Sequence, residues 1–137
     1  MAQKHKHVPE MREYAGLAHG PIFAPSVGRY LKGMIVEAPL PLWALPKKAK
    51  LADVHATLVA AYEGERFVKV ASLEEAAATK TLDPEGLNGT NDLKLYVFGH
   101  DDEVRLVALL DNLGKGASGA AVQNINIALG LDEGAGL

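Results

Sequence analysis

The sequence predicts an α+β domain with a mostly antiparallel mixed sheet and helices packed on one of its faces. Two observations support this class. Short apolar runs with the alternation of β-strands are interrupted by helical patterns, and the last two runs, 93–99 and 104–110, flank a polar turn that favours a hairpin. Because the chain contains no internal repeat and no linker-like segment, a single domain over residues 1–137 is the simplest organisation.

The composition is that of an ordinary globular protein, with 48% hydrophobic and 23% charged residues. A net charge of -3 gives no reason to expect nucleic acid or an anionic membrane as partner. No apolar run approaches the roughly 18 residues of a membrane span, and the basic N-terminus lacks the apolar core of a signal peptide. We therefore expect a cytoplasmic protein. The absence of cysteine excludes disulfides, thiolate metal sites and a cysteine nucleophile within these 137 residues.

In the first half of the chain, Pro9 fits the first turn of a helix that should run over 9–17. The proline-bounded segment 20–25 looks like a short strand. A second strand is predicted within 31–42, where Pro39 and Pro41 mark either the end of regular pairing or a sheet edge.

In the second half, apolar residues at helical spacing predict an amphipathic helix over 51–62, and an alternating strand follows at 67–71. Ser72 and Glu75 have the spacing of a capping box and predict a short helix over 73–78. Segment 79–92 is rich in turn formers and should be a loop. After the two strands of the hairpin, a last helix and a loose tail complete the chain.

The stretch 111–130 contains the pattern G-x-G-x-x-G at Gly114, Gly116 and Gly119, after a strand and before a helix. Such a helix start, beside Lys115, is a plausible anion site. A dinucleotide fingerprint also needs a following strand with an acidic residue, whereas here only Asp132 follows, on a tail. A helix cap is therefore the better interpretation. The amides at 123, 124 and 126 are expected to be core hydrogen-bonding groups or interface contacts.

His5 and His7 alternate, so in an extended segment they point to the same side. They could ligate a metal, but no third ligand is evident, so no metal site is predicted. They could also form a solvated basic terminus, or supply a general base near neutral pH. Arg29 and Lys32 flank a glycine-containing loop. They are either solvated surface cations or a clamp for a phosphate or carboxylate.

Four stretches together resemble one family: HKHVPEM at 5–11, GRYLKGMIVEAPL at 28–40, GTND at 89–92 and DNLGKGASGAAVQNINIALGL at 111–131. They are similar to the C-terminal part of the N-acetyl-gamma-glutamyl-phosphate reductases, closest to the shorter form. That family is related to the semialdehyde and glyceraldehyde-phosphate dehydrogenases, and the resemblance implies the fold of their C-terminal domain.

The resemblance implies an NADPH-dependent enzyme of arginine biosynthesis. In that family a cysteine thiolate attacks an acyl phosphate, and hydride from NADPH reduces the resulting thioester to a semialdehyde. A histidine of the H-x-H-x-P-E motif serves as acid and base. Here it is His7 or His5, with His7 preferred because it directly precedes the helix entry. Arg29 and Lys32 occupy the region that binds the anions of the small-molecule substrate.

The resemblance also implies that the glycine stretch faces the nicotinamide. The cofactor contacts would then be Lys115, Gly116 and Asn124, on a helix over 114–131 that returns to an NADP-binding domain. The family's nucleophilic cysteine and nucleotide fingerprint lie upstream of its H-x-H motif, and this chain has neither. We therefore expect the isolated chain to be inactive and to bind NADP weakly. A non-enzymatic oligomerisation module is the competing hypothesis, and a homo-oligomer, most simply a dimer, is expected in either case.

Overall fold

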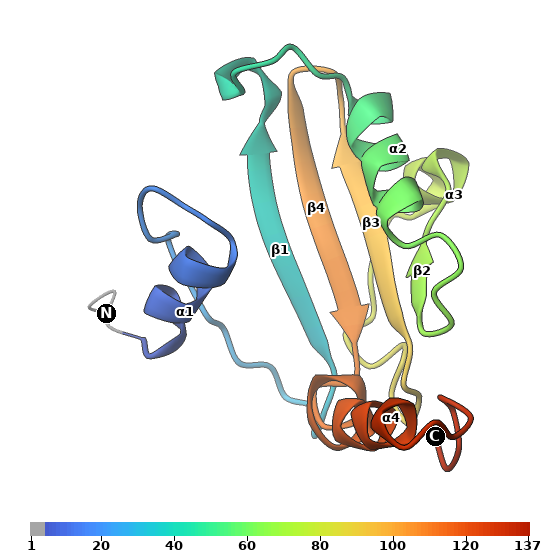
Figure 1. Ribbon diagram of the computed structural model, residues 1–137. Helices are drawn as coiled ribbons and strands as arrows, with labels where there is room; N and C mark the ends of the chain where they lie inside the picture. The colour runs from blue at the N-terminus through green and yellow to red at the C-terminus, as the bar shows by residue number, and fades with distance from the viewer. Residues whose placement is uncertain (1–4) are drawn as a thin grey trace.

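A computed structural model describes residues 5–137 and shows a twisted sheet with helices around it (Figure 1). Residues 1–4, where the basic N-terminal segment begins, lie outside the described residues. The elements in chain order are α1 His7–Tyr14, β1 Met34–Pro41, a 3₁₀ turn η1 Leu42–Ala44, α2 Leu51–Ala61, β2 Val68–Val70, α3 Leu73–Ala78, β3 Leu93–Gly99, β4 Glu103–Leu110, a π-helical turn η2 Gly114–Ser118 and α4 Gly119–Ala128.

The sheet has the strand order β1-β4-β3-β2. β4 is antiparallel to both of its neighbours, with Val107 opposite Glu37 on β1 and opposite Tyr96 on β3. β2 is parallel to β3, and α3 with the loop after it forms the crossover between these strands. This arrangement confirms the α+β class and the mostly antiparallel mixed sheet.

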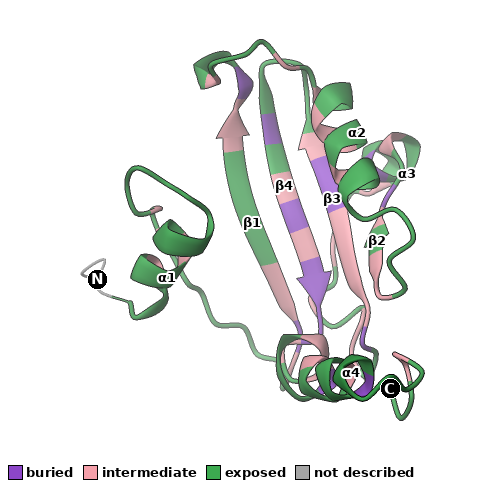
Figure 2. Ribbon diagram, in the orientation of Figure 1, coloured by how far each residue is buried: buried purple, intermediate pink, exposed green. Residues whose placement is uncertain are grey.

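The core lies on both faces of the sheet. Tyr96 and Val97 are neighbours in β3, so their side chains point to opposite faces. Val97 packs with Val104 and with the apolar stripe of α2, whereas Tyr96 packs with Val107 and with Ala76 of α3. α2 and α3 therefore cover opposite faces, a detail that differs from the expectation of helices on one face. Burial is greatest along β3 and β4 (Figure 2).

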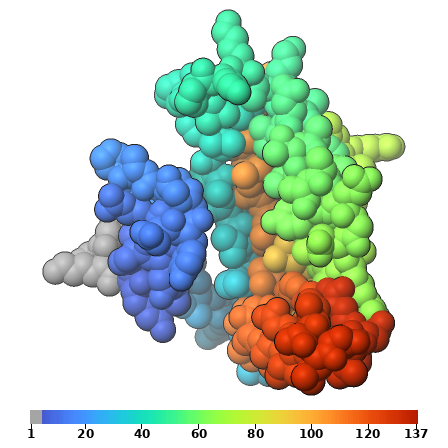
Figure 3. Space-filling view, in the orientation of Figure 1, coloured from blue at the N-terminus to red at the C-terminus, as the bar shows by residue number. Residues whose placement is uncertain are grey.

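The predicted strand at 20–25 is wrong. Residues 15–33 form an irregular connection between α1 and β1, without a strand. Pro21 and Pro25 cannot donate to a ladder, and Ile22 is 90% exposed, so neither pairing nor burial stabilises an extended segment there. Figure 3 shows α1 and this connection as a lobe beside β1.

The two prolines of β1 stand at a sheet edge, the second of the two alternatives that the sequence left open. Pro39 and Pro41 both belong to β1, which has β4 on one side only. Proline is tolerated at an edge because the missing N–H can face solvent. The helix predicted from Pro9 begins at His7 and ends at Tyr14, and Gly16 follows with a φ of 62° that ends the helical path.

Three of the segments that connect the strands and helices lie at the same end of the sheet. β4 ends at Leu110 at this end, and its antiparallel partners β1 and β3 begin here. The segment before β1, the loop before β3 and the turn before α4 must therefore meet. In Figure 1 they gather around α4 at the lower end of the sheet.

Candidate functional site

The side chain that joins these connections is Asp111, the first residue after β4. It is 1% exposed. Its Oδ1 accepts hydrogen bonds from the backbone N–H groups of Leu113 at 2.9 Å and Gly114 at 3.0 Å. Its Oδ2 accepts from the backbone N–H of Gly89 at 2.8 Å and from Lys32 Nζ at 2.9 Å. A single carboxylate thus holds three chain segments together.

This geometry decides what the glycine stretch does. The N–H groups before α4 that could bind an external anion already bind the carboxylate of Asp111. The next turn is the π-helical η2, in which Gly116 N–H donates to the backbone carbonyl of Asp111 at 2.9 Å. The stretch is therefore a capped helix start with an internal anion, which supports the cap interpretation over a phosphate-binding fingerprint.

The contacts also set the charge of Asp111. The hydrogen bond from Gly89 N–H and the ammonium of Lys32 hold the pKa of this carboxyl well below its usual range. Asp111 therefore stays ionised at any physiological pH. An ionised, fully bonded carboxylate is compatible with burial, whereas the same group without partners is not.

Lys32 and Arg29 do not form a clamp in this structure. The ammonium of Lys32 bonds to Asp111, and the Lys32 carbonyl accepts a hydrogen bond from Asn88 Nδ2 at 3.1 Å. The next residue, Gly33, donates its N–H to Asn112 Oδ1 at 2.7 Å. Arg29 is exposed and makes no ion pair with another described residue. Of the two cations, Arg29 is the one available to an external anion.

A second polar network lies on the inner side of α4. Gln123 Oε1 accepts hydrogen bonds from Lys115 Nζ at 2.6 Å and from Asn91 Nδ2 at 2.9 Å. Gln123 Nε2 donates to Glu133 Oε1 at 2.6 Å. Lys115 is half-buried, and its ammonium lies 5.7 Å from the centre of the Phe67 ring, at cation–π range. Lys115 is therefore held as part of the chain's own packing.

Two of the three helix amides face the protein interior, and Asn124 does not. Asn126 is buried and donates from Nδ2 to the carbonyls of Glu133 at 3.1 Å and Ala135 at 2.9 Å. These bonds fold the tail back onto α4, so the expectation of a loose tail is wrong. Asn124 is exposed on the outer side, where it is free to contact another molecule or domain.

Gly119 begins α4 against Asn91, which is 5% exposed and whose Oδ1 has no hydrogen-bond partner. A Cβ built on Gly119 would lie 2.3 Å from this oxygen and 2.9 Å from the backbone carbonyl oxygen of Gly114. Asn91 Nδ2 donates to Gln123 Oε1, which also accepts from Lys115 Nζ, and this bond keeps the Asn91 oxygen turned toward Gly119. Only glycine fits at position 119. Gly116 has no such neighbour, since the nearest atoms to its Cβ position are at 3.5 Å.

The histidines belong to a separate cluster at the start of α1. His7 Nδ1 lies 2.6 Å from Glu10 Oε2. A carboxylate only accepts, so Nδ1 carries the proton, and Nε2 of the neutral ring is left as an acceptor. His5 accepts the His7 backbone N–H at Nδ1, at 3.3 Å, and its ring lies 4.7 Å from that of Phe23. Of the two rings, His7 has the better geometry for a general base.

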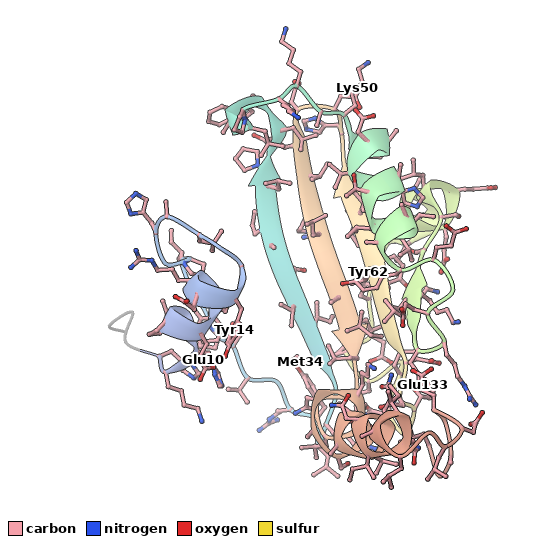
Figure 4. All side chains as sticks on the ribbon, in the orientation of Figure 1. Glu10, Tyr14, Met34, Lys50, Tyr62 and Glu133 are labelled. Atoms are coloured by element: carbon pink, nitrogen blue, oxygen red, sulfur yellow. The ribbon has the colours of Figure 1, made fainter. Side chains whose placement is uncertain are left out.

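The structure does not bring these histidines to the Asp111 end of the sheet. Glu10, the partner of His7, and Glu133, the partner of Gln123 on α4, lie on well-separated parts of the molecule (Figure 4). Over residues 5–137, no group of three or more histidine, aspartate or glutamate side chains could hold a metal ion. In the same part of the chain, no helix is long and apolar enough to cross a membrane.

The sequence motifs pointed to Lys32, Lys115 and Gly116 but not to Asp111, which binds Lys32 and Gly116. They also did not point to Asn91, which binds Gln123, the hydrogen-bond partner of Lys115. One signal could have found Asp111. An aspartate directly after a buried strand and three residues before Gly114 has the position of a helix N-cap. Asn91 carries no comparable local signal, because its partner Gln123 is 32 residues away.

Comparison with known proteins agrees with this architecture. Residues 1–112 match the family model described as "Semialdehyde dehydrogenase, dimerisation domain", and the chain belongs to this family. Its relatives include the "N-acetyl-gamma-glutamyl-phosphate reductase 2" of Nostoc sp., which is 49% identical over an alignment of 138 positions that covers 97% of this chain and 43% of the relative. The N-acetyl-gamma-glutamyl-phosphate reductase of Brucella anthropi is 56% identical over 129 residues, 93% of this chain and 42% of the relative.

These relatives confirm the resemblance inferred from the four motif stretches. The chain spans less than half the length of the curated relatives that it matches. The class defined by fold and family is therefore a dimerisation domain of the semialdehyde dehydrogenase type, similar to one part of these reductases.

The close approach at Gly119 is testable with a pair of glycine variants. Gly119→Ala should lower the free energy of unfolding by about 2 kcal/mol, because the new methyl group meets a buried amide and a backbone carbonyl that cannot move. Gly116→Ala is the matched control in the same stretch and should change it by no more than about 0.5 kcal/mol. Urea denaturation followed by circular dichroism measures both. An equal loss of stability in Gly119→Ala and Gly116→Ala would contradict the conclusion that only glycine fits at position 119.

Because Asp111 is buried and ionised, we expect wild type to be more stable than Asp111→Asn by an amount that depends on pH. At pH near 7, Tm should fall by roughly 5 °C or more, because asparagine has one acceptor oxygen and its NH2 group would face donors that the second carboxylate oxygen accepts from. The control Asp101→Asn breaks an exposed contact to Lys50 at 3.6 Å and should lower Tm by less than about 2 °C.

The sign of the pH effect follows from linkage. The pKa of Asp111 is lower in the native than in the unfolded chain, so the unfolded chain binds the proton more readily. The stabilisation by Asp111 is fully present above the unfolded pKa of about 3.9 and is lost as pH falls through the native pKa. In urea denaturation, the difference in the free energy of unfolding between wild type and Asp111→Asn should therefore be constant between about pH 5 and pH 7 and should shrink below about pH 4. A difference in unfolding free energy that stays the same in acid would contradict the proposed role of the ionised Asp111 side chain.

Proposed function

We propose that this chain forms the substrate-binding and dimerisation part of an NADPH-dependent reductase. The reaction converts N-acetyl-glutamyl phosphate to N-acetyl-glutamate semialdehyde in arginine biosynthesis, in the cytoplasm. One observation carries the proposal beyond the names of the relatives. Three of the four stretches that resemble the reductases meet at Asp111, through Lys32 of 28–40, Gly89 of 89–92 and the glycine turn of 111–131. Segments far apart in sequence thus form one structural unit.

The residues of this chain divide the task among them. His7, oriented by Glu10, presents Nε2 as the acid and base of the reaction. Its partner His5 shapes the same cluster through the His7 backbone. Arg29 is the exposed cation that would bind the substrate carboxylate or phosphate. Lys32 acts through Asp111, and keeps the segment that carries Arg29 against the rest of the domain.

The fit of this chain to NADP is partial. NADPH, when bound, supplies the hydride. The N–H groups before α4 already bind Asp111, so they offer no phosphate cradle, and we assign the phosphates of the cofactor to residues outside this chain. Gly116 and Asn124 are exposed, and Lys115 is half-buried beside them. These residues would contact the cofactor from one side only, consistent with weak binding by the isolated chain.

The isolated chain lacks the nucleophile of the proposed reaction. Formation of the acyl-enzyme requires a thiolate, and these 137 residues contain no cysteine. The chain therefore supplies binding, orientation and proton transfer, and a nucleophile from elsewhere completes the site.

A non-enzymatic oligomerisation module is the second candidate function. The family model describes a dimerisation domain, and the chain exposes apolar surface that association could cover. Ile125 on α4 is 56% exposed, Leu129 directly after α4 is 68% exposed, and Val36 on β1 is 49% exposed. Such surface favours a homo-oligomer under either function, so ligand binding must separate the two.

The isolated chain should show no turnover of N-acetyl-glutamyl phosphate with NADPH. The missing thiolate is the physical reason. NADPH absorbance measures the rate, and the full-length Brucella anthropi reductase serves as the positive control. Turnover of N-acetyl-glutamyl phosphate by this chain above the enzyme-free background would overturn the division of the active site proposed above.

Substrate recognition is testable through Arg29 alone, since changing Lys32 also disturbs Asp111. Titration of N-acetylglutamate, followed by NMR shifts, should show binding that weakens about tenfold or more in Arg29→Met. Lys48→Met, an exposed lysine elsewhere, is the charge-matched control and should bind as wild type does. Sedimentation should give a dimer for all three. A firm dimer without any affinity would favour the oligomerisation module.

A further inference from the structure

The loop before β3 contains Asn88 followed by Gly89, a sequence prone to spontaneous chemistry. In an asparagine–glycine pair the backbone nitrogen of glycine can attack the asparagine side-chain carbonyl, because glycine has no Cβ to hinder the approach. Asn88 is the only asparagine in the chain followed by glycine. The residues after the other asparagines all carry side chains, as at Asn124 before Ile125.

The structure restrains both reacting groups. The attacking atom, Gly89 N, donates its hydrogen to Asp111 Oδ2 at 2.8 Å. The attacked amide of Asn88 donates from Nδ2 to the Lys32 carbonyl at 3.1 Å and to Glu85 Oε1 at 3.3 Å. Gly89 itself has a φ of 79°, a conformation that the surrounding contacts maintain. Attack requires the nitrogen to leave Asp111 and the amide to leave Lys32.

Asp111 is also a poor base for the proton of Gly89. Its pKa lies well below the usual range because it accepts hydrogen bonds from Gly89 and Lys32, so it has little tendency to take a proton. The contact therefore holds Gly89 N–H without activating it. The buried Asn88 Oδ1, which has no hydrogen-bond partner, shows that this amide is positioned by its nitrogen alone.

We propose that Asn88–Gly89 is a deamidation site that the Asp111 carboxylate keeps closed, and that opening of this contact converts Asn88 to aspartate or isoaspartate. The inference is independent of the reductase function, because it concerns only contacts within this chain.

The chemistry needs only water. Gly89 N forms a bond to Asn88 Cγ and loses its proton to solvent. The bond from Cγ to the side-chain nitrogen breaks, and ammonia leaves with a proton taken from water. Water then opens the cyclic imide at either carbonyl. Opening at one gives aspartate, and opening at the other gives isoaspartate, in which the main chain runs through the side-chain carbon.

The product does not restore the original contacts. An aspartate at position 88 places a carboxylate against the Lys32 carbonyl and the Glu85 carboxylate, which are both acceptors. An isoaspartate adds a methylene group to the backbone before Gly89 and displaces its N–H from Asp111. The reaction would thus release one of the segments that Asp111 holds, and the release is irreversible.

The test is peptide mapping by mass spectrometry after incubation of the full chain at mildly alkaline pH. In folded wild type, Asn88 should deamidate at least about tenfold more slowly than in the guanidinium-unfolded chain, as expected for a site that needs local opening. Asp111→Ala should raise the rate roughly tenfold, since a buried contact is lost without adding another asparagine. Asn124 is exposed but is followed by isoleucine, so it should show no measurable deamidation in the folded, the unfolded or the Asp111→Ala chain.

A variant destabilised elsewhere separates the local contact from global stability. Val97→Ala removes packing between β3 and α2, away from the Asp111 contacts. When the two variants are compared under conditions of equal unfolded fraction, Val97→Ala should accelerate deamidation of Asn88 much less than Asp111→Ala does. Equal acceleration would overturn the proposal. So would a folded wild type that deamidates as fast as the unfolded chain.

Hydrogen exchange keeps the test decisive if Asp111→Ala fails to fold. The Gly89 amide of the wild type should be strongly protected, and its protection should decline in parallel with the rise in Asn88 deamidation as urea is added below the unfolding transition. A Gly89 amide that exchanges as freely as an unfolded one would show that Asp111 does not close the site.

Discussion

The hydrogen bonding of the Asp111 carboxylate is the constraint on which this end of the molecule depends. A buried carboxylate has only acceptor sites, and each needs a donor if burial is not to be costly. Here the donors are Lys32, Gly89, Leu113 and Gly114, which precede β1, β3 and α4. The antiparallel pairing of β4 with both neighbours makes this convergence possible, because β1 and β3 begin where β4 ends.

The same carboxylate explains the division of roles within the domain. By binding the N–H groups before α4, it converts a glycine-rich turn that resembles a phosphate site into a rigid support. Behind this turn, Lys115, Gln123 and Asn91 form a second set of hydrogen bonds that seats α4 on the loop before β3. What remains exposed for other molecules is the outer side of the turn and helix, together with the segment that carries Arg29.

Much of the fold was predictable because its signals are local. The alternating runs predicted the strands of the hairpin, and Ser72 with Glu75 predicted α3, where Ser72 Oγ accepts the Glu75 N–H at 3.0 Å. The segment 20–25 had the composition of a strand but found no partner, since β1 pairs only with β4. Asn124 and Asn126 are indistinguishable by residue type. Which of them is buried depends on the face that α4 turns toward the tail.

The sequence by itself determined the α+β class, the positions of most elements and the likeness to the reductases, because periodicity and motifs depend on neighbouring residues. It also determined that no thiolate is present. Only the tertiary structure decided that Lys32 binds Asp111, 79 positions away, and that α1, which begins at His7, lies apart from α4 (Figure 1). Contacts between distant residues depend on how the strands pair, and neither composition nor spacing determines that pairing.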